Sequence, residues 1–408
     1  MPATPGRSAK SFSRGLTGNI LVFGLVSFLT DVSSEMIYPL LPLFLTAVLG
    51  AGPVFLGLIE GLAESTSSLL KLFSGLLSDR SNRRKPLVLA GYGLSSLARP
   101  LVAATATPMQ VLLIRFTDRV GKGIRTSPRD ALIVESVDPT LRGRAFGFHR
   151  AMDHAGAIAG PLLASALLAS VTSDLRTVFW LAAIPGGFAV VLILVGVREA
   201  PRPPRPMTGV APLDALPRGE LRAYLLILFL FTLGNSSDAF LLLQAGRLGV
   251  TPTAIPLLWV MFHLVKMASV LPFGALSDRI GRRGMIVAGW GVYALAYLGF
   301  ALARTELHVW LLFALYGLFY GLTEGTEKAL LADLAPPDRR GGAFGWYHFA
   351  VGIGALPASL LFGWLWQQAG APAAFGFGAL LAALAAGLLL ILVHPSSPVA
   401  AKKEETVP

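Results

Sequence analysis

Two basic segments of the chain nearly repeat each other: GLLSDRSNRRK at residues 75–85 and GALSDRIGRRG at residues 274–284, 199 positions later. A second pair, DALIVESVDPTLRGRAFGFHR at 130–150 and KALLADLAPPDRRGGAFGWYH at 328–348, repeats at a distance of 198. Two separate matches at nearly one offset are hard to obtain by chance. The sequence therefore predicts two similar halves.

The composition indicates a membrane protein. The 408 residues are 54% hydrophobic and only 14% charged, with a mean hydropathy of +0.65, whereas soluble proteins average about 25% charged residues. Runs such as 177–197 reach the roughly 20 residues needed to cross a bilayer. We expect an all-α polytopic membrane protein with twelve spans. These are 17–47, 53–78, 86–106, 109–136, 144–170, 176–197, 221–247, 253–277, 284–303, 307–334, 342–369 and 372–393.

The connections between these spans alternate in charge. One set is densely basic, as at 80–85, 198–222 and 279–283, whereas the other set holds only Arg176, Arg247 and Arg304. The positive-inside rule then places both termini in the cytoplasm of a multi-pass protein in the cell inner membrane. The first apolar stretch is too long for a cleavable signal. The net charge of +11 is explained by these loops, so no nucleic-acid partner is expected.

A Pro-rich, charged stretch divides the chain almost in half and is typical of a semi-rigid linker. The predicted domains are a cytoplasmic tail over 1–16, a six-helix bundle over 17–197, a cytoplasmic linker over 198–220, a second six-helix bundle over 221–393 and a cytoplasmic tail over 394–408. Duplicated halves of this size predict a solute site near the bilayer midplane.

Residues 75–85 and their copy at 274–284 resemble the loop motif of the major facilitator superfamily: a Gly, then Asp-Arg, then a basic cluster. Asn82 stands where the family has Gly, and Asn tolerates left-handed geometry. The resemblance implies twelve helices in two pseudo-symmetric bundles. It also implies a gating role, in which the glycines allow close helix approach and the aspartates pair with basic groups. The implied gating residues are Gly75, Asp79, Arg80, Arg83, Gly274, Asp278 and Arg279.

The fourth span reads LLIRFTDRVGKGIRTSPRD over 112–130. The superfamily places here an arginine, followed by a glycine-rich step, that is associated with proton coupling. Arg119, followed by Gly121 and Gly123, matches this pattern, and Arg115 is the competing match. Lys122 stands where many relatives have Gln.

The fifth span is similar to the antiporter motif of the exporter branches, with Ala164 and Ser165 in place of the closing glycines. The resemblance favours export over import, although ordinary small-residue packing would produce similar spacing. The matching residues are Gly147, Gly156, Gly160 and Pro161.

Several carboxylates lie inside the predicted spans, where an ionisable group is costly and normally faces a cavity or a partner. The deepest by position are Asp31, Glu35, Glu60 and Glu64. A carboxylate removed from water binds a proton more readily, and an approaching cation such as Arg119 reverses this preference. We therefore expect these four carboxylates and Arg119 to couple transport to protons.

Other polar side chains follow helical stripes in both halves and mix both charges, which predicts a polar, charged or zwitterionic solute. Equivalent positions carry different charges: Glu64 aligns with His263, and Arg129 aligns with Glu327. About half of these residues are expected to be structural. The candidate pathway residues are Tyr38, Arg115, Asp118, Lys122, Arg150, Asp153, His154, Asp238, His263, Lys266, Tyr320, Glu324 and Glu327.

The predicted function is secondary active transport, with proton-coupled antiport (efflux) by alternating access. The alternatives are a proton symporter that imports an organic anion or metal chelate, and a non-transporting sensor of the same fold. A membrane-embedded enzyme is disfavoured because the chain has no HExxH, GxSxG or P-loop pattern.

We expect no cofactor and no resident metal. The chain lacks cysteine, and His263 with Met267 is weak evidence for a soft-metal pair. The expected partners are the solute, protons and the lipid bilayer, with the protein a monomer.

Overall fold

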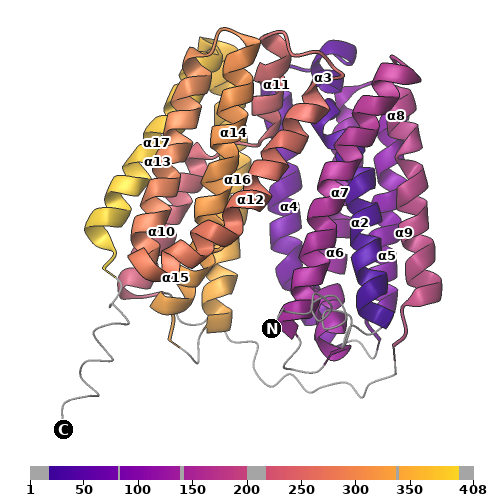
Figure 1. Cartoon of the computed structure of the whole chain (residues 1–408), viewed down its shortest axis with the longest axis horizontal. Coiled ribbons are helices and arrows are strands. Elements are labelled where there is room, and N and C mark those ends of the chain that lie inside the picture. Colours follow the sequence, from indigo (N-terminus) through magenta and orange to yellow (C-terminus); the bar gives the residue numbers. More distant parts are fainter. Residues whose placement is uncertain (1–17, 81–82, 138–141, 200–216, 337–339, 395–408) are drawn as a thin grey trace, which may run out of the picture. The chain divides into compact units, whose positions relative to one another are not determined.

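The computed structural model describes residues 18–80, 83–137, 142–199, 217–336 and 340–394 (Figure 1). Nearly all of these residues are helical, and no strand occurs among them. The predicted tails and most of the predicted linker lie outside the described residues, apart from His394 and from 198–199 and 217–220.

Each of the first six predicted spans corresponds to one helix or to a series of consecutive helical segments. The elements are α2 (Gly18–Ile37), η1 (Tyr38–Leu40), α3 (Leu41–Leu43), η2 (Phe44–Val48), α4 (Pro53–Arg80), α5 (Lys85–Ala98), η3 (Arg99–Ala104), α6 (Pro108–Glu135), α7 (Arg142–Ser170), α8 (Leu175–Leu181) and α9 (Ala183–Gly196).

The last six spans are matched in the same way. The elements are α10 (Gly219–Gly234), α11 (Ala239–Arg247), α12 (Ile255–Ile280), α13 (Arg282–Leu302), α14 (Glu306–Thr323), α15 (Thr326–Leu334), α16 (Arg340–Ala369) and α17 (Ala371–Leu392).

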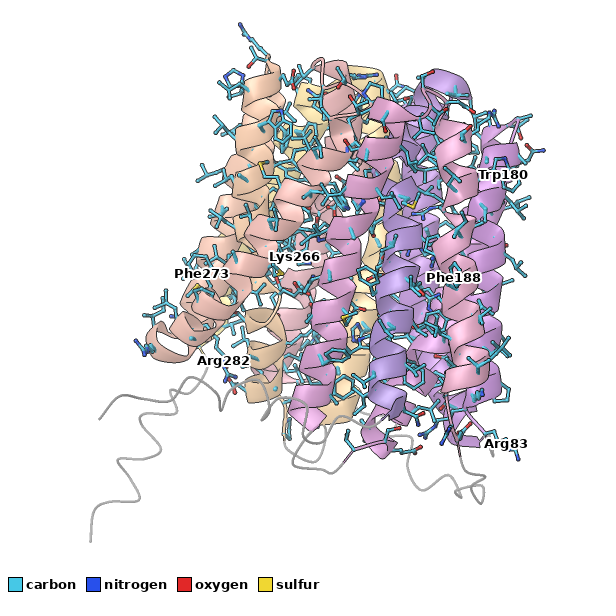
Figure 2. The ribbon with its side chains drawn as sticks, turned by 45° about the vertical axis from the view of Figure 1, so that its right-hand side comes forward. Arg83, Trp180, Phe188, Lys266, Phe273 and Arg282 are labelled. Atoms are coloured by element: carbon cyan, nitrogen blue, oxygen red, sulfur yellow. The ribbon has the colours of Figure 1, made fainter. Side chains whose placement is uncertain are left out.

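Among the described residues, nine stretches are long and apolar enough to cross a membrane. One of them, Gly342–Leu392, contains both α16 and α17, while α4 and α6 are long enough but more polar. Large apolar side chains such as Trp180 and Phe188, which are 47% and 60% exposed, point outward (Figure 2). An apolar outer surface of this kind suits a lipid environment.

The chain divides into two compact units by its internal contacts. Unit 1 comprises residues 1–51, 66–208 and 251–260, and unit 2 comprises 52–65, 209–250 and 261–408. This division differs from the predicted bundles in two segments: 52–65, with the start of α4, groups with unit 2, and 251–260, with the start of α12, groups with unit 1.

Helix packing repeats between the two halves. In the first half, α2 packs on α7 and α9, and α5 packs on α6 and α9. In the second half, the equivalent helices pair in the same way: α10 packs on α16 and α17, and α13 packs on α14 and α17. The sequence repeat therefore corresponds to a repeated helix arrangement.

Both first helices of the halves are interrupted at equivalent positions. Pro39 and Pro42 lie where α2 gives way to the short turns η1, α3 and η2, because proline removes a backbone donor and disturbs the helix. In the second half, α10 ends at Gly234 and α11 begins at Ala239. At this second interruption, the Tyr293 hydroxyl donates a hydrogen bond to the Gly234 carbonyl at 3.0 Å.

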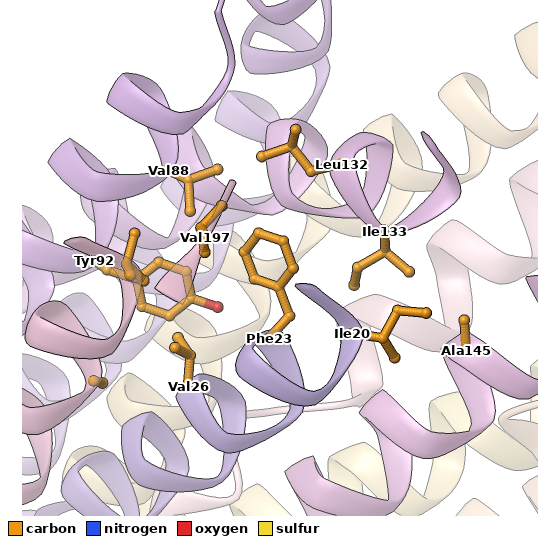
Figure 3. Close-up of a cluster of buried hydrophobic side chains, with 11 residues drawn as sticks. Ile20, Phe23, Val26, Val88, Tyr92, Leu132, Ile133, Ala145 and Val197 are labelled. Atoms are coloured by element: carbon orange, nitrogen blue, oxygen red, sulfur yellow. The ribbon is translucent and has the colours of Figure 1, made fainter. Parts of the chain in front are cut away.

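The apolar core at one end of unit 1 joins α2, α5, α6, α7 and α9. Phe23 and Tyr92 lie at its centre (Figure 3). Close to this core, α5 and α6 meet backbone to backbone: a Cβ on Gly91 would lie 2.6 Å from the Gly121 carbonyl oxygen, and the reverse distance is also 2.6 Å. This glycine contact brings the polar face of α6 next to Tyr92.

Candidate functional site

The polar centre of unit 1 is built around Asp118 on α6. Arg99 of η3 donates from Nε to Asp118 Oδ1 at 2.8 Å, and its Nη1 donates to the Thr30 carbonyl of α2 at 3.1 Å. Arg115 and Arg119 each lie 3.9 Å from Asp118 Oδ2. Asp118 was predicted as a pathway residue. In the structure it is buried among arginines, one of which, Arg99, links η3 to α6 and α2.

The first two proton-coupling candidates lie directly against α7. A Cβ on Gly156 would be 2.5 Å from the Phe28 carbonyl and 2.9 Å from Asp31 Cβ, and a Cβ on Gly160 would be 3.0 Å from Glu35 Cβ. Two glycines of the antiporter-like motif thus bring α7 into backbone contact with α2 beside its carboxylates. The first glycine of the motif, Gly147, meets no atom within 4 Å, so no close helix approach occurs there.

Glu35 is joined to the start of α12 within unit 1. The indole Nε1 of Trp259 donates to Glu35 Oε2 at 2.7 Å. The Trp259 ring also packs on Tyr38, with centroids 5.3 Å apart, and the Arg115 guanidinium lies 5.6 Å from the Tyr38 ring centroid. A proton-coupling candidate and two pathway candidates therefore form one contact chain through Trp259.

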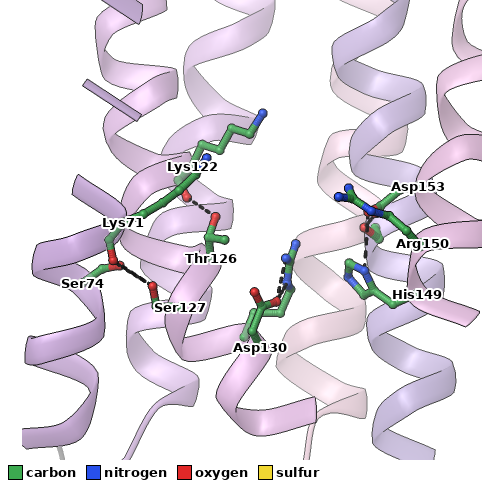
Figure 4. A network of polar contacts seen from close by, with 11 residues as sticks. Lys71, Ser74, Lys122, Thr126, Ser127, Asp130, His149, Arg150 and Asp153 are labelled. Carbon is green, nitrogen blue, oxygen red and sulfur yellow. Dashed lines mark hydrogen bonds and ion pairs between the residues drawn. The ribbon is translucent and has the colours of Figure 1, made fainter. Parts of the chain in front are cut away.

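Asp153 on α7 has several partners (Figure 4). It accepts a hydrogen bond from Ser27 of α2, and its Oδ2 lies 3.5 Å from His149 Nδ1 and 3.6 Å from Arg150 Nη1. Arg150 is 58% exposed on its side chain. The predicted pathway residue Arg150 is therefore an outward-facing partner of Asp153 in this structure.

In unit 2, Lys266 of α12 lies 3.1 Å from Glu324 Oε2, and its Nζ is 4.4 Å from the Tyr320 ring centroid. Three predicted pathway residues thus lie together, and Figure 2 marks Lys266 on its helix. Asp238, beside the break between α10 and α11, accepts a hydrogen bond from the Tyr316 hydroxyl at 2.5 Å. The interruption therefore places a carboxylate next to a cluster of tyrosines.

Glu327 is a buried carboxylate held by neutral donors. Trp290 Nε1 donates to its Oε1 at 2.9 Å, and the Tyr347 hydroxyl donates to its Oε2 at 3.0 Å. Glu327 is 8% exposed, and no ion pair of its side chain occurs within the part of the chain that the structure describes. This arrangement can stabilise either a charged carboxylate or its protonated form.

The remaining candidates fall in different surroundings. Glu60 is buried and Glu64 is exposed, and both belong to the part of α4 that groups with unit 2. Lys122, His154 and His263 are half-buried on α6, α7 and α12. The structure therefore does not gather all four proposed proton-coupling carboxylates in one unit.

The gating candidates can be followed only in part. The side chains of Gly75, Asp79, Arg80 and Asp278 lie outside the described residues, while Arg83 and Arg279 are exposed. A Cβ on Gly274 would meet no atom within 4 Å. The close helix approach expected at Gly274 is therefore absent from this structure.

Comparison with known proteins identifies the family. The model of the Major Facilitator Superfamily matches residues 23–245 and 224–408. The chain belongs to the Major Facilitator Superfamily. It is 38% identical over 387 residues to "Uncharacterized MFS-type transporter MJ1317" of Methanocaldococcus jannaschii, covering 93% of this chain and 96% of that protein. This result confirms the resemblance predicted from the loop motif.

Two more distant comparisons agree with a superfamily fold. "Multidrug resistance protein MdtH" of Proteus mirabilis is 23% identical over 337 residues, covering 81% of this chain and 83% of that protein. A solved POT family transporter in complex with 5-aminolevulinic acid has a TM-score of 0.76 at 12% identity, covering 91% of this chain and 95% of that one. The second likeness shows the membrane-spanning transporter fold alone.

Sequence reasoning about this superfamily member missed several residues of the polar centres. Arg99 lies inside an apolar span, and because a charge embedded in the membrane is costly, its position alone marks it as a candidate. Trp259 and Trp290 gave no comparable signal, because aromatic residues are common in any membrane helix. Their roles follow only from the carboxylates that they contact.

Proposed function

We propose that this superfamily member is a proton-coupled secondary transporter that exports a polar, charged or zwitterionic solute by antiport. The observation that carries the proposal is the contact of Gly156 and Gly160 with α2 beside Asp31 and Glu35. A glycine-rich helix packed on two membrane-embedded carboxylates couples their surroundings to any movement of that helix. The distant multidrug resistance relatives also support export.

The proposal further takes the chain to be a monomer in the inner membrane, with both termini cytoplasmic and no enzymatic activity. The basic loops support the orientation. Asp31, Glu35 and Arg119 carry the proton coupling in unit 1, and Glu60 and Glu64 are assigned to the same role in unit 2.

A second candidate is proton symport of an organic anion. It is favoured by the polar centre of unit 1, where Asp118 faces Arg99, Arg115 and Arg119. A surplus of buried cations suits an anionic solute, and a proton carried together with an anion lowers the net charge that crosses the membrane.

The test is proton flux in proteoliposomes that enclose a pH dye, with an imposed pH gradient and pools of amino acids, organic acids, sugar phosphates and drugs. Antiport predicts that an added solute dissipates the gradient in the direction of solute exchange, and that Glu35→Gln and Arg119→Ala abolish the response. If a folded protein gave no proton movement with any pool, or if both variants retained the full response, the proposal would fail.

A further inference from the structure

Arg125 on α6 is a buried cation with guanidinium donors that find no acceptor among the described residues. The residue is 5% exposed, and its Nε and Nη1 have no acceptor in the part of the chain that the structure describes. Its contact there is with the Tyr92 ring, whose centroid lies 4.1 Å from the guanidinium carbon. A guanidinium carries five N–H donors in a planar fork, and leaving them without acceptors in a buried position is unfavourable.

The packing holds Arg125 in this position. A Cβ on Gly91 of α5 would lie 2.7 Å from Arg125 Cβ, so the two helices are in close contact at this level. Tyr92, the next residue of α5, is fully buried in the apolar core. The close approach of the two helices therefore places the guanidinium against the Tyr92 ring.

Asp118, a carboxylate of the same helix, already has other arginine partners. Asp118 Oδ1 accepts from Arg99 at 2.8 Å, and Asp118 Oδ2 is 3.9 Å from both Arg115 and Arg119. The Asp118 carboxylate therefore already has three arginines around it, in addition to Arg125. The Nε of Arg119 likewise has no hydrogen-bond acceptor among the described residues.

Two further carboxylates near this stretch of α6, Asp31 and Glu35, belong to α2. Asp31 interacts electrostatically with Lys122 and Arg125, but no hydrogen bond joins it to either side chain in the described structure. Even with Asp31 and Glu35 included, the arginines and Lys122 outnumber the carboxylates around this stretch of α6. The centre therefore carries a net positive charge, which one more negative charge would offset.

We propose that Arg125 on α6 forms a binding subsite for the carboxylate or phosphate group of the transported solute. Guanidinium forks bind such oxyanions through two parallel hydrogen bonds, which lysine cannot do. The proposal rests on the proposed function, because the bound anion is taken to be part of the cargo.

The test measures binding directly on the purified full-length protein. Inorganic phosphate and citrate are titrated calorimetrically at constant ionic strength, with sodium chloride as the reference anion. We expect one of them to bind saturably, and the one that does distinguishes a phosphate from a carboxylate preference. Arg125→Gln should weaken that binding by about tenfold or more, because a charge-assisted bidentate contact is lost.

Two further variants keep the test decisive. Arg304→Gln removes an exposed arginine before α14 and should leave the affinity unchanged. Arg125→Lys keeps the charge but not the fork, and is expected to lower affinity for the same oxyanion. It is the variant to use if Arg125→Gln does not fold. The proposal is overturned if neither anion binds better than chloride, or if binding survives both substitutions at Arg125.

The outcome is separable from that of the proposed function. Saturable anion binding that depends on Arg125, without proton movement in proteoliposomes, would retain the subsite and reject proton coupling. Proton-coupled transport of a cationic solute, without anion binding, would retain the transporter and reject the subsite.

Discussion

Arg99 and Asp118 form a buried ion pair, 2.8 Å from Nε to Oδ1, that links η3 to α6. Since Arg99 also donates to the Thr30 carbonyl, the same guanidinium holds α2. Breaking a buried pair by removing one partner leaves an uncompensated charge and is strongly unfavourable.

We expect Asp118→Asn to lower the free energy of unfolding by about 3–5 kcal/mol, because Arg99 would keep its charge without a counter-ion. Thermal unfolding of the purified protein measures this as a lower midpoint. Asp333→Asn is the control: its ion pair with Arg282 is more exposed and should contribute at most about 1 kcal/mol. Equal effects of the two substitutions would contradict a structural role for the buried pair.

The contact between α7 and α2 gives a second prediction. Gly160→Ala places a methyl group 2.7 Å from the Val32 carbonyl and 3.0 Å from Glu35 Cβ, so the helices must separate. We expect at least a tenfold loss of solute-driven proton flux, which corresponds to about 1.4 kcal/mol. Gly147→Ala, on the same helix but with nothing within 4 Å, should transport normally. Normal transport by Gly160→Ala would argue against a role of this contact.

Trp259→Phe tests the link to Glu35. The change keeps an aromatic ring against Tyr38 but removes the N–H that donates to Glu35 at 2.7 Å. Because a hydrogen bond to a charged group contributes about 1.5–3 kcal/mol, the pH dependence of transport should shift, while expression and folding stay normal. Trp364→Phe, at an exposed position, is the matched control. An unchanged pH profile in Trp259→Phe would show that this hydrogen bond has no part in coupling.

Glu327 permits a comparison of two substitutions. Glu327→Leu leaves Trp290 Nε1 and the Tyr347 hydroxyl without their acceptor, and should destabilise the protein by about 1–3 kcal/mol per orphaned group. Glu327→Gln retains one acceptor and should be the milder change. If Glu327→Gln folds normally but loses transport, the carboxylate has a functional role; if both variants transport normally, it is structural.

The pH dependence of anion binding distinguishes symport from antiport. Asp31 lies in the field of Glu35 on its own helix, Asp153 on α7, and Lys122 and Arg125 on α6. If the coupling proton binds Asp31, that proton and an anion at Arg125 favour each other, because a charged Asp31 repels the anion. Coupling of this kind is symport, whereas the proposed antiport requires the proton and the anion to compete. Symport therefore predicts that sulfate, whose charge is constant between pH 5.5 and 8, binds more tightly as pH falls.

With one linked proton, the sulfate affinity changes by at most about tenfold per pH unit. Asp31→Asn should flatten the dependence, whereas Glu306→Gln, an exposed position, should preserve it. Weaker binding at low pH is the result that an antiport mechanism requires, and it would reject symport.

The helix positions could be predicted because each helix is specified mainly by the residues within it. Runs of apolar residues give the spans, and the 198–199 offset predicts that the second half repeats the first. The interruption at Pro39 and Pro42 was also readable in principle, because proline acts on its own helix. The break after Gly234 has a local signal of the same kind, since residues 234–238 read GNSSD, but the hydrogen bond from Tyr293 to the Gly234 carbonyl could not be predicted from it.

The candidate site was harder to predict because charge pairing is a tertiary property. Helical spacing brings Arg115, Asp118 and Arg119 close together on α6, but spacing could not show that Arg99 would pair with the Asp118 carboxylate. In the same way, the four-residue spacing between Glu60 and Glu64 does not reveal that Glu60 is buried and Glu64 exposed. Sequence spacing defines which residues share a helix face, whereas packing decides what that face meets.

The glycine contact between α5 and α6 has a consequence for genetics. At Gly91 and Gly121, the atoms that block an added methyl group include a backbone carbonyl oxygen of the opposite helix, 2.6 Å away in each case, and no side-chain substitution can remove a carbonyl. A selection for second-site suppressors of Gly121→Ala should therefore yield few simple revertants other than glycine itself. At Gly299 the obstacle is the side chain of Leu312, at 2.3 Å, so Gly299→Ala should be rescued readily by a smaller residue at position 312.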